Sequence, residues 1–233
     1  MLLIKLEFLW CLLTLEILSI NFMLHYYIKK LQYLIKPREY NYPKTTVEYF
    51  FQCKKRDVVS FSSINRSKKI IQTNEFFNLT KKFNVLFVKD IERSWFNSIN
   101  IKYIKSFIKK KNIYCIGHSM GAFNAIMFSN FFSVKKVIAF SPQFSIYPFI
   151  SKDKTYLNYA ASIKKWKYKK LKFNKRTKYY LIFGDTANEQ YHMDQIPNLK
   201  NIKKIVISKC NHNSASKLKK RGELYPLINK YFN

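Results

Sequence analysis

Residues 112–121, with the sequence NIYCIGHSMG, give the clearest indication of the fold. Its first five residues form a short apolar run typical of a buried strand, and residues 122–132 have the pattern of a helix. Between them stands a G-x-S-x-G sequence, although the chain has only four glycines. A Cβ at either flanking position would collide with the neighbouring strand or helix, and the turn needs unusual backbone angles. This order of strand, turn and helix predicts that Ser119 is a catalytic nucleophile.

Strand and helix patterns alternate on both sides of this motif. Strands are expected over residues 84–88, 136–140, 178–183 and 204–208, and helices over 76–82, 98–111 and 216–232. Two further runs, 45–53 and 56–61, are expected to form an antiparallel pair. The alternation predicts an α/β fold with a mostly parallel sheet flanked by helices, and residues 143–177 form a cap-like insertion between two strands.

The first 36 residues are predicted to be an apolar N-terminal helix. Residues 8–28 are long and apolar enough to span a bilayer, although Glu16 would be expensive at its centre. Three explanations stay open: a membrane anchor, a helix with one polar edge, and a mis-assigned start with translation beginning at Met23. If the segment spans, the lysines after it favour the cytoplasmic side for the rest of the chain. The catalytic domain is expected over residues 44–233.

Composition limits the classes of function that remain. With 233 residues, 48% of them hydrophobic, the chain can bury one substantial core. Its net charge of +30 fits an anionic partner, or simply a solvated, lysine-rich background; no nucleic-acid motif accompanies the charge, so nucleic acid is not the expected partner. Four scattered cysteines fit reduced thiols in the cytoplasm better than zinc or disulfides. No metal or cofactor is expected.

A serine nucleophile needs a base and an acid that orients the base. His212 follows the last predicted strand, at the sheet edge where the serine turn also opens, so it is the expected base. The acid should come from the loop after the preceding strand. Asp185 is the first choice there, Glu189 is the alternative, and Asp194 shares the loop.

Backbone N–H groups should stabilise the oxyanion that forms when the serine attacks. Met120 follows the nucleophile and should supply one donor, and Ser62 or Ser63 after an early strand should supply the other. Three further residues are candidate substrate contacts: His118, Trp95 and His192. Basic and aromatic residues interleave over 164–178, which suits an acidic or sugar-bearing substrate or, alternatively, a solvated amphipathic lid.

Together, Gly117–Gly121, Phe183-Gly184-Asp185 and His212 resemble the α/β-hydrolase superfamily. Further stretches resemble a small bacterial subgroup often encoded near capsule and surface-glycan genes: Phe87-Val88-Lys89-Asp90, Arg93-Ser94-Trp95 and residues 139–145. The resemblance implies serine-dependent ester cleavage without a cofactor. One departure is Ala187, which occupies the superfamily's usual later position for the acid.

Three functions are therefore weighed. The first is an esterase-type serine hydrolase that forms an acyl-enzyme on Ser119 and acts on a small-molecule, acylated glycan or polysaccharide ester. The second is an acyltransferase that uses the same acyl-enzyme but passes the acyl group to a sugar hydroxyl. The third is a non-catalytic, basic protein attached to the inner face of the membrane through residues 1–36.

Overall fold

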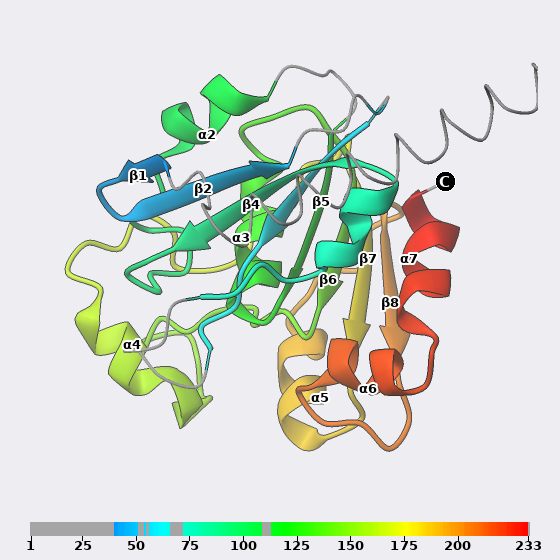
Figure 1. Cartoon of the computed structure of the whole chain (residues 1–233). Coiled ribbons are helices and arrows are strands. Elements are labelled where there is room, and N and C mark those ends of the chain that lie inside the picture. Colours follow the sequence, from blue (N-terminus) through cyan, green and yellow to red (C-terminus); the bar gives the residue numbers. More distant parts are fainter. Residues whose placement is uncertain (1–39, 51–53, 55, 66–71, 109–112, 233) are drawn as a thin grey trace, which may run out of the picture. The chain divides into compact units, whose positions relative to one another are not determined.

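The computed structural model describes residues 40–50, 54, 56–65, 72–108 and 113–232 (Figure 1). The described part belongs to one compact unit, Tyr40–Asn233. The predicted N-terminal apolar helix lies outside the described residues. Within those residues, no helix combines the length and the apolar character needed to cross a bilayer.

Eight strands form a single sheet in the order β1-β2-β4-β3-β5-β6-β7-β8. Strands β1 and β2 are antiparallel to their neighbours, and β3 to β8 run parallel. The bounds are β1 Tyr40–Tyr42, β2 Thr45–Phe50, β3 Asp57–Phe61, β4 Asn84–Asp90, β5 Ile113–His118, β6 Val134–Phe140, β7 Lys178–Phe183 and β8 Ile202–Val206. The mostly parallel sheet predicted from the sequence is therefore confirmed.

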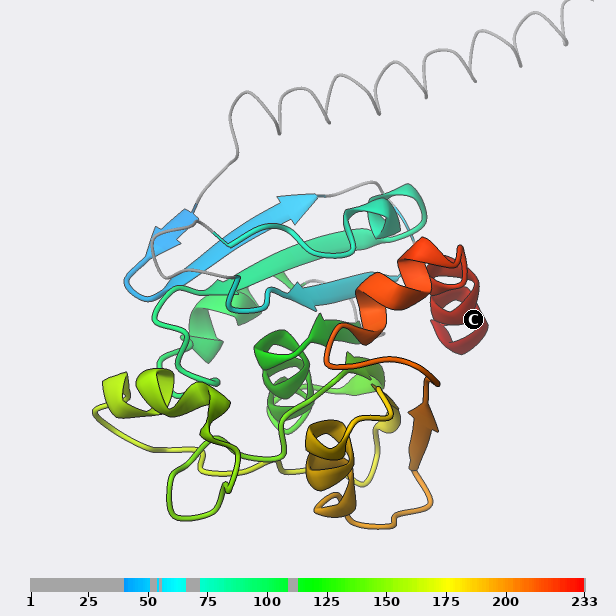
Figure 2. The same ribbon diagram turned by 90° about the horizontal axis from the view of Figure 1, so that it is seen from below.

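Helices cover both faces of this sheet (Figure 2). Their bounds are η1 Phe77–Lys81, α2 Ile101–Phe107, α3 Met120–Phe128, η2 Lys154–Tyr156, α4 Leu157–Ser162, α5 Ala187–Asp194, α6 Ser214–Lys220 and α7 Leu224–Phe232. Helix α3 is buried along its whole length and packs on β3, β5 and β6. On the opposite face, η1 packs on β4 and α7 on β6.

Alternation along the strands separates the two cores. Cys115 of β5 and Leu181 of β7 belong to the cluster that packs around α3. Their neighbours Tyr114 and Tyr180 face the other side, where Tyr114 contacts Phe232 and Tyr180 stacks on Tyr231. Because successive side chains of a strand point to opposite faces, each central strand contributes to both cores.

Three sequence expectations differ from the structure. The antiparallel pair expected from 45–53 and 56–61 is not formed by their described parts: β2 (Thr45–Phe50) is antiparallel to β4, and β3 lies between β4 and β5. The predicted helix 216–232 is divided into α6 and α7 at Gly222, whose φ of 75° ends α6. Residues 187–194 form the helix α5, although no helix was expected there.

The turn between β5 and α3 depends on two backbones in close approach. A Cβ at Gly117 would lie 2.2 Å from the carbonyl carbon of Gly121, and a Cβ at Gly121 would lie 2.2 Å from the carbonyl oxygen of Phe61. The colliding atoms are backbone atoms of the first turn of α3 and of the last residue of β3, so they cannot move aside as a flexible side chain could. Glycine is therefore required at both positions.

We predict that Gly121→Ala abolishes cooperative folding or lowers the free energy of unfolding by several kcal/mol, on the order of the largest single-residue effects. Gly222→Ala is the matched control, because a Cβ there meets no atom within 4 Å and only the positive φ is unfavourable. That control should lose about 1 kcal/mol. Urea denaturation of both variants checks this, and equal losses would contradict it.

Candidate active site

Ser119 sits on a strained turn at the carboxyl end of β5. Its φ of 55° and ψ of −122° lie outside the regions that non-glycine residues favour. The turn is tied down from both sides: the N–H of Ser119 donates to the Phe140 carbonyl at 2.8 Å, and its carbonyl accepts from the N–H of Phe123 at 3.1 Å. The surrounding sheet and helix thus hold the serine in this unfavourable conformation.

His212 lies within hydrogen-bonding distance of this serine. Its Nε2 is 2.8 Å from Ser119 Oγ, although 92 residues separate the two in the chain. Its Nδ1 is 2.7 Å from Glu189 Oε1. Because a carboxylate only accepts, Nδ1 carries the proton and Nε2 is left free to accept the serine hydroxyl. Serine, histidine and acid therefore form a continuous chain of hydrogen bonds.

Helix α5 positions Glu189. The side chain is 2% exposed, and its second oxygen accepts from the N–H of Gly184 at 3.1 Å. Burial raises the pKa of this carboxyl, but hydrogen bonds and charge, mainly from His212, outweigh burial and leave the pKa below its usual value. Glu189 is thus an anion enclosed beside the imidazole.

Asp185, the first choice from the sequence, does not contact the imidazole. Its carboxylate accepts from the N–H groups of Lys209 and Cys210, at 2.6 and 2.9 Å, and these bonds lower its pKa. Asp185 therefore braces the loop that carries His212 from the outside. Asp194 is also remote, since it bonds to Gln190 on the exposed side of α5. The alternative acid, Glu189, is the one brought to His212.

The loop between β8 and α6, which carries His212 and is called the His212 loop below, has its backbone held close to the sheet. A Cβ at Gly184 would lie 2.2 Å from the carbonyl oxygen of Cys210, so glycine permits this approach. His118 supports the same loop, with Nε2 2.8 Å from the His212 carbonyl. Desolvation, with a smaller contribution from the nearby His212, lowers the pKa of His118 to about 4. His118 is therefore neutral near pH 7 and donates to that carbonyl, so it supports the loop; its role as a substrate contact stays a prediction.

The expected oxyanion donors fare differently. Met120 opens α3, so its N–H has no acceptor within the helix. The N–H of Ser62 instead extends the sheet by donating to the Val88 carbonyl at 3.0 Å. The N–H of Ser63 donates to Glu75 Oε1 at 3.2 Å, and the Ser63 hydroxyl bonds to the same oxygen. The structure thus leaves Met120 available and engages both serine amides elsewhere.

Two other predicted substrate contacts are buried supports. Nε2 of His192 is 3.0 Å from Asp153, and its Nδ1 accepts from the N–H of Phe144, so it ties α5 to the insertion. Trp95 is 0% exposed and its Nε1–H donates to Gln143 Oε1 at 3.2 Å. Neither side chain faces open solvent. Among the described residues, no group of three His, Cys, Asp or Glu side chains is arranged to hold a metal ion.

Sequence reasoning missed two polar residues of the insertion that reach Ser119 and His212. Gln143 Nε2 lies 2.9 Å from Ser119 Oγ, and the Tyr156 hydroxyl lies 3.1 Å from His212 Nε2. Both side chains are buried, and Ser119 itself is 3% exposed. The signal for Gln143 is its place just after β6, at the sheet edge where the other site residues gather. No comparable signal marks Tyr156.

A tight turn after β4 carries Trp95. Asp90 accepts from the backbone N–H groups of Ser94 and Phe96, at 3.0 and 3.3 Å, and from the Ser94 hydroxyl. Arg93, Trp95 and Phe96 all have positive φ there. Burial raises the pKa of Asp90 to about 6 despite these hydrogen bonds. A single carboxyl group therefore organises the turn on which the indole depends.

This raised pKa predicts a pH-dependent stability. The unfolded chain releases the Asp90 proton at a lower pH than the folded chain does. From pH 4 to pH 7 the free energy of unfolding of the wild type should therefore fall by about 2 kcal/mol relative to that of Asp90→Asn. Hydrogen bonds lost in the variant lower its stability equally at both pH values, so only the change between them matters. Urea titrations at pH 4 and 7 measure it, and a pH-independent difference would refute the assignment.

The fold, though not the sequence, matches known proteins. Neither a protein-family model nor a curated protein sequence matches this chain. A capsule O-acetyltransferase of Neisseria meningitidis serogroup A is similar in structure, with 15% identity, a TM-score of 0.59 and coverage of 82% of this chain and 93% of that one. An α/β hydrolase from a Moroccan lagoon metagenome gives 16% identity, a TM-score of 0.53 and coverage of 84% and 97%. An α/β superfamily hydrolase from Oenococcus oeni gives 11% identity, a TM-score of 0.51 and coverage of 84% of this chain and 99% of that one.

These likenesses, each over 82–84% of the chain, show an α/β-hydrolase fold, which confirms the fold predicted from the sequence motifs.

Proposed function

We propose that this protein is an esterase-type serine hydrolase, with Ser119 as nucleophile, His212 as base and Glu189 as the acid that orients the base. The observation that carries the proposal is the unbroken path from Ser119 Oγ through the imidazole to Glu189, with contacts of 2.8 and 2.7 Å. A hydroxyl needs such a partner to become nucleophilic near neutral pH. The strained backbone of Ser119 also supports a functional role.

The proposed reaction has two halves. Ser119 Oγ attacks the acyl carbonyl carbon while its proton passes to His212 Nε2, and Glu189 stabilises the imidazolium that forms. The imidazolium then protonates the leaving oxygen, and the acyl group remains on Ser119. In the second half, His212 removes a proton from an incoming water, whose oxygen attacks the acyl carbonyl carbon. The imidazolium then returns this proton to Ser119 Oγ as the bond from Oγ to the acyl carbon breaks and the carboxylic acid leaves. The N–H of Met120 is the proposed backbone donor to the oxyanion.

The proposed substrate is an acyl ester, on a small molecule or on a glycan, with anionic character. The chain's net charge of +30 favours anionic ligands by long-range attraction. Structural similarity to a capsule O-acetyltransferase makes an acylated surface glycan the first substrate to test. The cytoplasm is the proposed location, with attachment to the membrane through residues 1–36 as the further hypothesis.

The triad assignment predicts a contrast between two acids. Glu189→Gln should lower kcat for p-nitrophenyl acetate by about 10²–10⁴-fold, because an amide cannot stabilise the imidazolium and favours the wrong tautomer. Asp185→Asn should stay within about threefold of wild type, because Asp185 only braces the loop. The opposite ranking would return the role to Asp185.

Labelling by a fluorophosphonate should disappear in Ser119→Ala; labelling that persists there would refute the proposed function.

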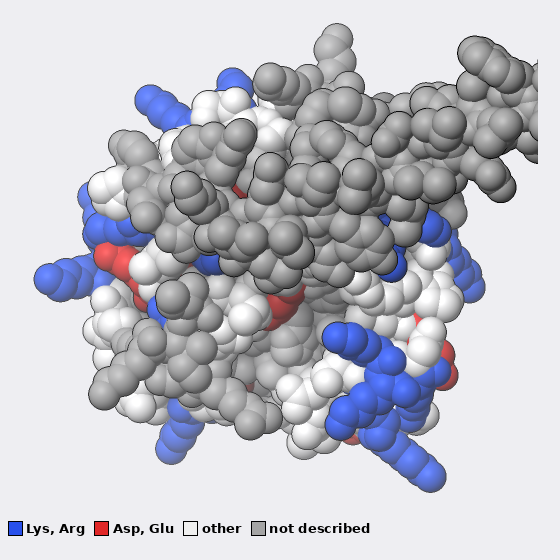
Figure 3. Space-filling model, viewed as in Figure 1, with Lys and Arg blue, Asp and Glu red and all other residues white. Residues whose placement is uncertain are grey.

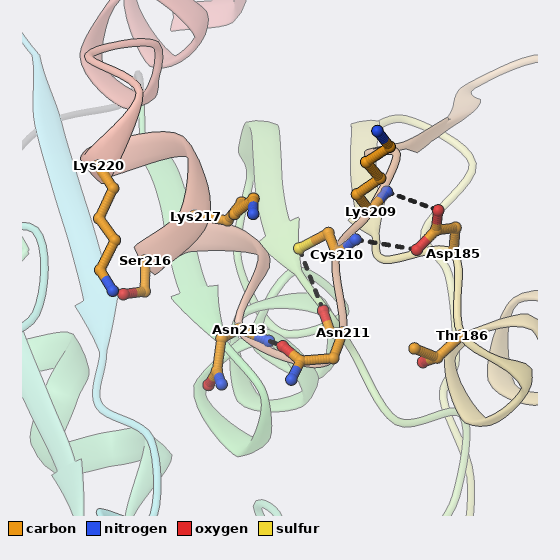
Figure 4. A pocket seen from close by; sticks show the side chains of 9 residues that line it. All are labelled: Asp185, Thr186, Lys209, Cys210, Asn211, Asn213, Ser216, Lys217 and Lys220. Atoms are coloured by element: carbon orange, nitrogen blue, oxygen red, sulfur yellow. Dashed lines mark hydrogen bonds between the residues drawn. The ribbon is translucent and has the colours of Figure 1, made fainter.

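Acyl transfer is a second candidate, which a separate observation favours. One structure of the Neisseria capsule O-acetyltransferase contains CoA. In this chain a cavity of about 630 Å³ adjoins the His212 loop (Figure 4). Lys209 of the loop and Lys217 and Lys220 of α6 line it, and Figure 3 shows basic side chains gathered over this region. Phosphate groups of an acyl donor would suit such a cavity.

This candidate predicts salt-sensitive competition by CoA. CoA should inhibit p-nitrophenyl acetate hydrolysis by the wild type, and the Lys217→Glu/Lys220→Glu variant should need at least about tenfold more CoA. The Lys102→Glu/Lys105→Glu variant carries the same change of net charge on exposed positions of α2 and serves as the matched control. If both variants weaken inhibition equally, the cavity is not a specific site. If CoA does not inhibit the wild type, the acyl-CoA donor is excluded.

A further inference from the structure

The carboxamide of Gln143 points at the nucleophile with a fixed orientation. Its Nε2 lies 2.9 Å from Ser119 Oγ, 3.1 Å from the Tyr156 hydroxyl and 3.2 Å from His212 Nε2. Its Oε1 meets the indole N–H of Trp95. An indole N–H can only donate, so the atom facing it must be the amide oxygen. The amide hydrogens are therefore directed at Ser119 and its surroundings, and the reverse orientation is excluded chemically.

The structure provides several constraints that hold this amide in place. Gln143 is 0% exposed and follows Ser141-Pro142, the two residues that come directly after β6. Trp95 packs against Tyr156 and Tyr159, with ring centroids 5.3 and 5.7 Å apart. Burial raises the pKa of Tyr156 to about 12, so its hydroxyl stays protonated beside the amide. The side chain of Gln143 is thus held by Trp95 on one side and contacts Ser119, Tyr156 and His212 on the other.

The proposed reaction needs a second donor to the oxyanion. Acyl transfer through a serine ordinarily uses two N–H donors. Met120 can supply one, but the N–H groups of Ser62 and Ser63 are engaged by the Val88 carbonyl and by Glu75. Gln143 is a further N–H donor beside the nucleophile, since its Nε2 contacts the serine oxygen to which the carbonyl carbon will bond.

From these contacts we infer that the side-chain amide of Gln143 is the second oxyanion donor, which makes Gln143 a catalytic residue; the inference rests on the proposed function. In the free protein one amide hydrogen bonds to Ser119 Oγ. As Oγ bonds to the carbonyl carbon, its proton passes to His212 and the π electrons of the carbonyl move to the carbonyl oxygen. The amide hydrogen then donates to that oxygen, one bond beyond the new C–O bond.

The test compares Gln143→Met with wild type in two measurements. The first is turnover of p-nitrophenyl acetate, and the second is binding of phenylboronic acid, which forms a tetrahedral adduct with Ser119 that resembles the reaction intermediate. Methionine matches glutamine in length but has no N–H. We expect kcat to fall about 10²–10³-fold with KM within about threefold, and the boronate to bind more weakly by a similar factor. A merely structural role would not weaken the tetrahedral adduct selectively. Gln190→Met, on the exposed side of α5, is the matched control.

Two more variants keep the test decisive if Gln143→Met fails to fold. Gln143→Glu keeps the shape and the bond from Trp95 but replaces the donor with an acceptor, so its kcat should fall at least as far. Trp95→Phe keeps the ring packing but frees the amide to rotate, and should lower kcat about tenfold. If wild type turns over in a Ser119-dependent manner and the Gln143 variants keep more than a fifth of kcat and of boronate affinity, this inference is wrong. If wild type shows no Ser119-dependent turnover, the proposed function itself fails.

Discussion

The absence of a Cβ at Gly117 and Gly121 is the constraint from which the rest of the site follows. Each added Cβ would lie 2.2 Å from backbone atoms of the adjoining helix or strand. Only with this close approach can β5 turn directly into α3 and leave Ser119 at φ 55°. Gly184 has the equivalent role beneath the His212 loop. Three of the four glycines in the chain are thus placed where backbone must approach backbone at the site.

Sequence patterns predicted the elements that local chemistry determines. The strand before Ser119, the turn itself and the strand over residues 178–183 follow from apolar runs and rare glycines. The predicted antiparallel pairing of the runs 45–53 and 56–61 was wrong, because the choice of strand partner depends on the whole sheet. In the structure β4 lies between β2 and β3, so β2 pairs with β4. The order of the strands along the chain does not reveal that a later strand is inserted between two earlier ones.

The acid shows why a site residue is harder to predict than a fold. Asp185 directly follows β7, so distance along the chain favoured it. Residues 187–194 form a helix, however, and this helix returns Glu189 to Gly184 and His212 while Asp185 accepts two backbone N–H groups of the neighbouring loop. The difference between the two carboxylates arises from one helical turn. Thr186 at the N-cap and Glu189 three residues later have the spacing of a capping box, so the sequence does carry a start signal for this helix.

The insertion between β6 and β7 connects fold and chemistry in a way that the superfamily motifs do not describe. Asn97 accepts from the N–H groups of Lys167 and Tyr168, and His192 bonds to Asp153, so the insertion is fastened to the β4 turn and to α5. Its first residue, Gln143, and its helix-forming Tyr156 reach Ser119 and His212. A cap fastened at both ends in this way can hold polar groups against the nucleophile at fixed distances, which a loosely packed lid could not do. The insertion therefore contributes directly to the polar contacts around Ser119 and His212.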